Sequence, residues 1–200
     1  MGNDILDILL VLTERVYRNE EISAYLESIS EPPFKLEKLP ISFSKDSFFI
    51  NEFKAMEILL KKPLKKYRCV VIGCFFDPCV EFLRMKRYRV IGCGEASMML
   101  ASLLEKDFGV ISCFKGAVSR VKLLVKRLGL MERFVGISVV NEEEESLIKG
   151  GQKLIERGAD SLIVTHLSSL KLLNFLSGYF KNVRVIEPLK AGLVLANAMF

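Results

Sequence analysis

The segment at residues 69–83, CVVIGCFFDPCVEFL, constrains the fold more than any other part of this sequence. It opens with a run of β-branched residues and cysteine that ends at Gly73, which is typical of a short strand covered on both faces. Asp77 then stands where a helix N-cap is expected, and Pro78 stands at the first helical position, where its missing N–H is no loss. The segment therefore predicts a buried strand, a tight turn and the start of a helix.

Cys74 lies at the C-terminal end of this predicted strand. Ligands of open α/β sheets bind at that edge, and a nearby helix N-terminus lowers the pKa of a thiol. Cys74 is therefore the first candidate for a reactive side chain. The alternative is that Cys74 is a small apolar residue that packs in the core.

A similar pattern recurs at residues 161–177, SLIVTHLSSLKLLNFLS. An apolar strand is followed by a polar pair, a serine cap at Ser168 or Ser169, and a helix. His166, the single histidine of the chain, stands on its strand where Cys74 stands on the first. Two such units predict two lobes that face each other across a cleft, each with one side chain able to exchange a proton.

The remaining apolar and amphipathic segments alternate between strand and helix patterns. Strands are predicted at residues 5–12, 34–43, 89–91, 108–112, 134–140 and 183–186. Helices are predicted at residues 14–28, 48–60, 95–104, 117–128 and 142–157, the last capped by Asn141, and from Pro188 towards the C-terminus. This alternation predicts an α/β fold of two doubly wound lobes with mostly parallel sheets, at residues 1–91 plus 185–200 and at residues 92–184.

Composition excludes several classes of protein. A hydrophobic content of 50% over 200 residues is enough for a packed core. No apolar run reaches the ~18 residues of a membrane span, and no secretory signal is evident, so we expect a soluble, cytoplasmic protein. Five cysteines, an odd number, favour free thiols in a reducing compartment. A net charge of +5 slightly favours an anionic substrate, but it does not indicate a nucleic-acid partner.

Motifs for metal, nucleotide and serine-hydrolase chemistry are absent from the sequence. There is no Walker sequence, no HExxH helix and no G-x-S-x-G elbow. Gly92-Cys93-Gly94 predicts a sharp turn, but no glycine follows at the spacing of a dinucleotide fingerprint. Cys69, Cys74 and Cys79 are five residues apart, which is not the spacing of a zinc knuckle. We therefore expect neither a metal nor a cofactor, and we interpret the basic segment at 61–68 as a solvated connection.

Two short motifs carry a family resemblance. At residues 74–78, CFFDP, and 92–97, GCGEAS, the chain resembles the aspartate/glutamate racemase superfamily, most closely its hydantoin racemase branch. Those proteins carry a C-F-x-D-P turn and, shortly after it, a G-x-G-E-A-x turn. The resemblance continues through residues 108–112, 158–160 and 187–188, so it extends from about Tyr67 to the C-terminus.

The resemblance implies a cofactor-independent racemase of two pseudo-symmetric lobes. One cysteine from each lobe flanks the α-carbon of the substrate, so that one removes a proton and the other supplies one from the opposite face. Cys74 matches the first family cysteine. Counted without gaps from residues 158–160, the second falls on His166, whereas a slipped alignment pairs Thr165-His166 with a Thr-His of glutamate racemases and leaves Val164 at the cysteine's place.

The chain also departs from the family in two turns. An N-P-N-T-S turn is replaced by residues 12–15, where Thr13 supplies a hydroxyl, and a threonine pair is replaced by Ser112-Cys113. The resemblance implies Cys74 and His166 as catalytic residues. It further implies substrate contacts at seven positions, although Phe75 also suits the core: Thr13, Phe75, Asp77, Glu95, Ser112, Cys113 and Thr165.

The expected partner is a small carboxylate or an amino-acid derivative, with no nucleic acid or membrane, and related assemblies imply a homo-oligomer. Two other functions stay open. One is a decarboxylase of a malonate-like acid or a cis–trans isomerase in which Cys74 acts alone. The other is a protein that binds a small molecule without turnover, since the N-P-N-T-S turn is missing.

Overall fold

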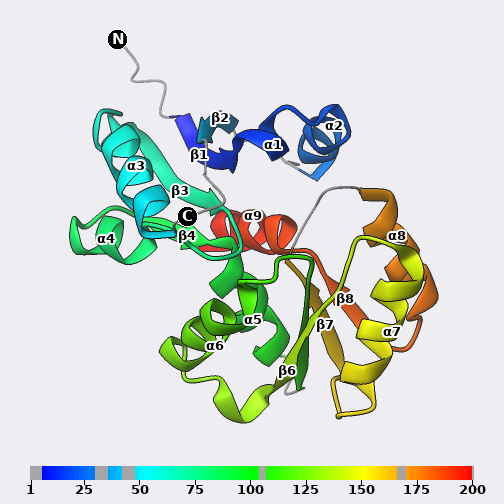
Figure 1. The fold of residues 1–200 in the computed structure, drawn as a ribbon. Coiled ribbons are helices and arrows are strands. Elements are labelled where there is room, and N and C mark those ends of the chain that lie inside the picture. Colours follow the sequence, from blue (N-terminus) through cyan, green and yellow to red (C-terminus); the bar gives the residue numbers. More distant parts are fainter. Residues whose placement is uncertain (1–5, 30–35, 42–47, 104–106, 166–169, 200) are drawn as a thin grey trace. The chain divides into compact units, whose positions relative to one another are not determined.

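The computed structural model describes residues 6–29, 36–41, 48–103, 107–165 and 170–199. The chain forms two compact units, one of residues 1–93 and 192–200 and the other of residues 94–191 (Figure 1). The expected lobes divided the chain at 91/92 and at 184/185. Each unit contains one four-stranded parallel sheet with helices packed around it, as the α/β class predicted.

The first unit has the strand order β2-β1-β3-β4, and every pair is parallel. Its strands are β1 (Leu6–Thr13), β2 (Leu36–Ile41), β3 (Tyr67–Gly73) and β4 (Val90–Gly92). Its helices are α1 (Glu14–Tyr17), α2 (Glu20–Ile29), α3 (Phe48–Leu60), the short 3-10 turn η1 (Leu64–Lys66) and α4 (Val80–Met85). The two central strands, β1 and β3, are apolar because helices and loops cover both of their faces.

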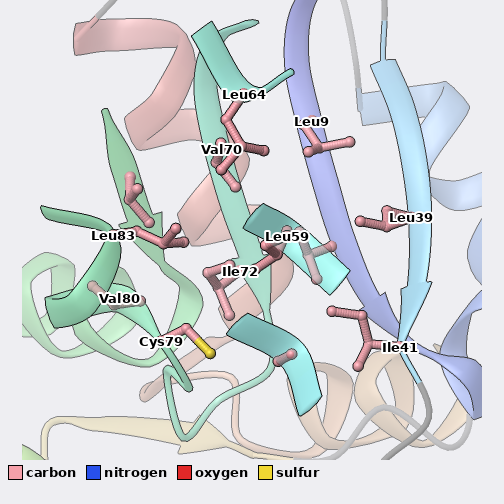
Figure 2. Close-up of a cluster of buried hydrophobic side chains, with 13 residues drawn as sticks. Leu9, Leu39, Ile41, Leu59, Leu64, Val70, Ile72, Cys79, Val80 and Leu83 are labelled. Atoms are coloured by element: carbon pink, nitrogen blue, oxygen red, sulfur yellow. The ribbon is translucent and has the colours of Figure 1, made fainter. Parts of the chain in front are cut away.

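The core on one side of this sheet brings α3 and α4 against the strands (Figure 2). Leu59 of α3 and Leu83 of α4 are fully buried, as is Ile72 of β3 at 1% exposure. Cys79 belongs to the same cluster, with its sulfur among the aliphatic side chains. Burial of each large aliphatic side chain contributes about 1.5–3 kcal/mol, so this cluster fixes α3 and α4 against the β3 strand.

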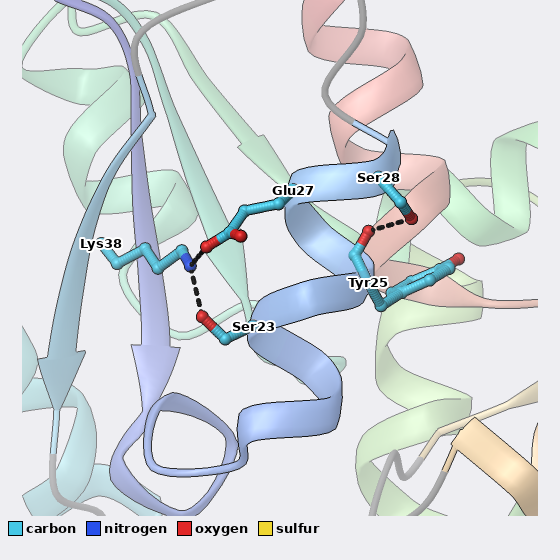
Figure 3. Close-up of polar contacts among 5 residues, drawn as sticks. All are labelled: Ser23, Tyr25, Glu27, Ser28 and Lys38. Atoms are coloured by element: carbon cyan, nitrogen blue, oxygen red, sulfur yellow. Dashed lines mark hydrogen bonds and ion pairs between the residues drawn. The ribbon is translucent and has the colours of Figure 1, made fainter.

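Polar contacts attach α2 to the edge strand β2 (Figure 3). Lys38 Nζ donates a hydrogen bond to Ser23 Oγ at 2.7 Å, and it lies 3.5 Å from Glu27 Oε1. The Ser28 hydroxyl donates to the Tyr25 carbonyl within the helix at 2.7 Å. Because the Glu27 side chain is largely exposed, its ion pair contributes less than about 1 kcal/mol, and the buried face of α2 provides most of the attachment.

The second unit repeats the topology of the first, with the strand order β6-β5-β7-β8. Its strands are β5 (Phe108–Ser112), β6 (Phe134–Val139), β7 (Ser161–Val164) and β8 (Arg184–Ile186). Its helical segments are α5 (Cys93–Leu103), α6 (Ala117–Arg127), η2 (Met131–Arg133), α7 (Glu144–Ile155) and α8 (Leu170–Tyr179). The last helix, α9 (Pro188–Met199), begins in the second unit and ends in the first.

Two predicted helices differ from the structure in how they are divided or where they start. The helix expected at 14–28 is divided, because the Asn19 side chain accepts the Ile22 N–H at 3.2 Å and starts α2 afresh. Asn141 does not cap α7. Its side-chain oxygen accepts the Glu143 N–H at 3.3 Å and closes a turn, and Glu143 itself is the N-cap.

Other predictions concern surface segments. In the basic segment, Lys61 pairs with Glu57 at 2.7 Å, and Lys62 lies 3.9 Å from Glu37, which suits a solvated connection. Within the described ranges, no helix has the length and apolarity needed to cross a membrane. The serine cap expected at Ser168 or Ser169 lies outside the described residues.

Candidate functional site

Cys74 directly follows Gly73, the last residue of β3, at the carboxyl edge of the first sheet. Its carbonyl accepts the Asp77 N–H at 3.0 Å, which closes a tight turn at residues 74–77. The side chain is half-buried and packs against the cluster that contains Cys79. Because β3 lies between β1 and β4, this thiol stands at the middle of the sheet edge rather than at its margin.

Three of the four other cysteines have a raised pKa. Burial raises the pKa of Cys69 and of Cys79 to about 12. Burial, with the Glu142 carboxylate as a second cause, raises the pKa of the half-buried Cys113 to about 11. A thiol with such a pKa stays protonated near neutral pH, whereas the thiolate is the reactive form. These three side chains are therefore structural thiols under ordinary conditions.

Asp77 is placed differently from the sequence prediction, because it does not cap a helix. Helix α4 begins at Val80 with Cys79 as its N-cap, and both Asp77 (φ 50°) and Cys79 (φ 66°) adopt the left-handed conformation. These two residues turn the chain once more before the helix starts, so Pro78 lies within a turn and not at the first helical position. The reason is local backbone geometry that the Asp-Pro pattern does not reveal.

The carboxylate of Asp77 is buried against the end of β4. A Cβ atom added at Gly92 would lie 2.2 Å from Asp77 Cγ, so only glycine leaves room for this carboxylate. The helix start expected at Glu95 was wrong, and the chain passes directly from β4 into α5. Helix α5 starts directly at Cys93, and neither glycine has a positive φ. A glycine is thus needed at position 92 because a larger side chain would not fit beside Asp77, and not because the backbone there requires a glycine.

Phe75 and Glu95 are both buried, with 4% and 6% exposure. The Phe75 ring packs edge to face on Phe76, with 5.7 Å between the ring centroids. The burial of Phe75 suits the alternative interpretation, that it packs in a core, and its contact with a substrate stays a prediction. Glu95 stands in the first turn of α5, where the helix dipole favours a negative charge.

The carboxyl edge of the second sheet brings two predicted hydroxyl residues together. Thr165, the residue after β7, donates a hydrogen bond from Oγ1 to Ser112 Oγ at 2.9 Å, and Ser112 is the last residue of β5. The Phe114 N–H also donates to Ser112 Oγ, at 3.2 Å. Both hydroxyl side chains are buried, so this pair orders the end of the sheet at which Cys113 begins the next loop.

Thr13 closes β1 at the carboxyl edge of the first sheet. Its side-chain oxygen accepts the Val16 N–H at 3.4 Å and so caps α1. His166 lies outside the described residues, and its sequence position is two residues after the end of β7. No group of three or more His, Cys, Asp or Glu side chains suited to a metal ion occurs in the described ranges.

The two sheets have the same strand order, so each strand of one sheet has an equivalent strand in the other. β3 and β7 hold the same place in their sheets, between the first and the fourth strand of each unit. Cys74 follows β3 by one residue, and Thr165 and His166 follow β7 by one and two residues. Cys74 and His166 therefore occupy corresponding sequence positions, each within two residues of the end of the same strand of its sheet.

Sequence reasoning missed two carboxylates that organise loops. Glu52 of α3 accepts the Cys79 N–H at 3.1 Å, and nothing in the amphipathic pattern of α3 reveals this role. Glu187 is buried and accepts the N–H groups of Leu189 and Lys190 at 2.6 and 2.5 Å, so it caps α9. The pair Glu187-Pro188 carries a signal for that cap, because proline is favoured at the first helical position.

Comparison with known proteins identifies the fold. No protein-family model and no curated protein matches this sequence. Among solved structures, an allantoin racemase from Klebsiella pneumoniae is similar with a TM-score of 0.77 at 18% identity, over 97% of this chain and 87% of that one. A maleate isomerase from Pseudomonas putida has a TM-score of 0.67 at 10% identity, over 97% and 92% of the two chains.

A glutamate racemase from Bacillus anthracis has a TM-score of 0.61 at 13% identity, over 99% of this chain and 82% of that one. At these identities the similarity establishes a common fold. The resemblance to the aspartate/glutamate racemase superfamily inferred from the sequence is thereby confirmed at the level of the fold.

Proposed function

We propose that this protein is an isomerase, a cofactor-independent racemase or epimerase of an amino acid or an amino-acid derivative. Cys74 and His166 are its two proton-transfer residues. The observation that carries this proposal is the repeated strand order: Cys74 directly follows β3, and in sequence His166 comes two residues after the end of β7, which holds the same place in its sheet. The similarity to the fold of allantoin and glutamate racemases supports the reaction class.

The chemistry requires one base and one acid on opposite faces of the substrate's α-carbon. In one direction the Cys74 thiolate takes the α-proton, the electron pair of the broken C–H bond forms an enediolate, and the His166 imidazolium protonates the other face. The opposite enantiomer reacts with the two roles exchanged. Thiol and imidazole groups are the side chains that enzymes most often use for proton transfer near neutral pH.

The substrate carboxylate needs hydrogen-bond donors that strengthen as negative charge develops on it. Ser112, at the carboxyl end of β5, offers a hydroxyl group for this role. The Thr165 hydroxyl donates its single proton to Ser112 Oγ, so it orients the Ser112 side chain and leaves the Ser112 hydroxyl proton available to a ligand. We assign the carboxylate of the substrate to the Ser112 hydroxyl.

A screen for loss of optical activity tests the function. Separate enantiomers of amino acids, hydantoins and related ureido acids are incubated with the protein and followed by polarimetry or chiral chromatography. We expect turnover of both enantiomers of one compound and loss of at least about 10²-fold in Cys74→Ser. Cys69→Ala, which changes a buried thiol of high pKa, is the control that retains activity. Unchanged activity in Cys74→Ser would exclude the mechanism.

A one-sided isomerase or decarboxylase is the second candidate, and the similarity to a maleate isomerase favours it. In this reaction Cys74 acts alone, as an acid or as a nucleophile that adds to a double bond and later leaves. His166→Ala distinguishes the two candidates, because it abolishes racemisation but leaves a one-cysteine reaction in place. Maleate and aryl-substituted malonates are the probes for this alternative.

A further inference from the structure

Cys79 is held at two points by a single residue of α3. Its backbone N–H donates a hydrogen bond to Glu52 Oε1 at 3.1 Å, and its thiol donates to the Glu52 backbone carbonyl, also at 3.1 Å. Because burial raises the pKa of Cys79 to about 12, the thiol keeps its proton and remains a donor at neutral pH. One residue thus fixes both the backbone and the side chain of Cys79.

The turn between β3 and α4 needs such a support because its backbone is unusual. Asp77 and Cys79 have φ angles of 50° and 66°, a conformation that side chains other than glycine adopt rarely. The Cys79 carbonyl accepts the Leu83 N–H of α4 at 2.9 Å, so α4 continues from this fixed point. Without the Glu52 contacts, residues 77–79 would relax towards more common conformations.

Cys74 lies at the other end of the same turn. Its carbonyl accepts the Asp77 N–H at 3.0 Å, and its side chain packs on the cluster that includes Cys79. The negative charge of an ionised Cys74 is among the causes, although the smallest, that raise the pKa of Cys79, so the two sulfurs share one neighbourhood. A movement of Cys79 is therefore transmitted to Cys74 over a short hydrogen-bonded segment.

We propose that Glu52 is a positioning residue for Cys74, acting through the hydrogen bond that its carboxylate accepts from the Cys79 N–H, while its backbone carbonyl holds the Cys79 thiol. The inference deepens the proposed function, on which its effect on turnover rests. Its effect on the Cys74 thiol is measurable without any substrate.

The experiment compares Glu52→Ala, Glu52→Gln and Glu52→Asp with the control Glu57→Ala. Glu57 lies exposed on the same helix and pairs with Lys61. Alkylation of Cys74 by iodoacetamide is followed by peptide mass spectrometry over a range of pH. The limiting rate at high pH reports the accessibility of the thiolate, and the midpoint reports its pKa, so geometry and charge are measured separately.

We expect the limiting rate to rise by about threefold or more in Glu52→Ala and Glu52→Asp, because the half-buried thiol becomes freer when the turn loosens. Glu52→Asp keeps the charge but is one methylene too short. Glu52→Gln retains an oxygen that accepts the Cys79 N–H, so its limiting rate stays that of the wild type. If Glu52→Ala does not fold by circular dichroism, the Gln and Asp variants still decide the question.

Equal limiting rates in Glu52→Gln and Glu52→Asp, or a wild-type rate in a folded Glu52→Ala, would overturn the inference. Where the proposed racemisation is observed, kcat falls about tenfold in Glu52→Ala with KM unchanged, and Glu52→Gln restores it. The expected alkylation pattern in a protein without any turnover would support the positioning role and contradict the proposed function.

Discussion

Cys74 and Cys113 are both half-buried, and each follows the end of a central strand, yet their surroundings differ. Burial and the carboxylate of Glu142 hold the pKa of Cys113 at about 11. Cys74 begins the turn that leads to α4. In this turn Asp77 packs against Gly92 of β4, and the Cys79 N–H donates a hydrogen bond to Glu52 of α3. At the scale of single residues, the two thiols therefore occupy similar positions in their sheets but have different groups around them.

The pKa of Cys113 gives a prediction with a definite sign. A thiol whose pKa is raised to about 11 is protonated at pH 8, so its alkylation rate rises about tenfold per pH unit and levels off near pH 11. Glu142→Gln removes one cause of the shift, lowers the pKa and speeds alkylation at pH 8–10. Glu144→Gln, on the first turn of α7, is the control. A Cys113 rate that levels off near pH 8.5 in the wild type would contradict the prediction.

Gly92 gives a prediction about stability. In Gly92→Ala the new methyl group meets the buried carboxylate of Asp77, so we expect the free energy of unfolding to fall by about 2–4 kcal/mol in urea denaturation. Gly178→Ala in α8 has open space around its Cβ and should be neutral or stabilising by up to about 1 kcal/mol. The double change Gly92→Ala with Asp77→Ala should recover part of the loss; equal effects at both glycines would refute the packing argument.

The first and last residues of a strand or helix were predictable where the sequence of that segment alone determines them. β5 at 108–112 and α3 at 48–60 have the predicted bounds, because an apolar run or a helical period begins and ends with the element. Helix starts that depend on a side-chain contact or on an unusual backbone conformation were not predicted. The Asn19 side chain starts α2 by accepting a backbone N–H. Helix α4 starts later than expected because Asp77 and Cys79, which precede it, are both left-handed.

The N-terminal cap of helix α9 gives a prediction about the stability of a single helix. The Glu187 carboxylate accepts two backbone N–H groups at the start of α9, so Glu187→Ala should lower the free energy of unfolding by about 1–2 kcal/mol. Glu187→Gln keeps one acceptor oxygen and should lose less. The exposed Glu132→Ala serves as the control in the same thermal or urea melts. A Glu187→Ala variant as stable as the control would show that the helix start is held by other contacts.

At the scale of the whole molecule, the two sheets have the same strand order, β2-β1-β3-β4 in one and β6-β5-β7-β8 in the other. The sequence revealed this repeat through two similar strand–turn–helix segments, so the α/β class was predicted from periodicity. It also predicted which side chains stand at the sheet edges, since β1 ends at Thr13, β5 at Ser112 and β3 just before Cys74. The tertiary partners were not predictable. Glu52 contacts the residues after Cys74 from an element distant in sequence, and no local pattern points to it. Gly92 belongs to a local pattern, but that pattern predicted a turn and not the packing of Gly92 against Asp77.

The location of the hydrogen isotope in the product tests the central claim of two-sided proton transfer most directly. Each enantiomer of a substrate is incubated in D2O and followed by proton NMR and chiral chromatography. We predict that deuterium appears at the α-carbon of the inverted product from either enantiomer, and that both Cys74→Ser and His166→Ala abolish inversion. Deuterium incorporated with retention of configuration only, or inversion that survives in His166→Ala, would contradict the account.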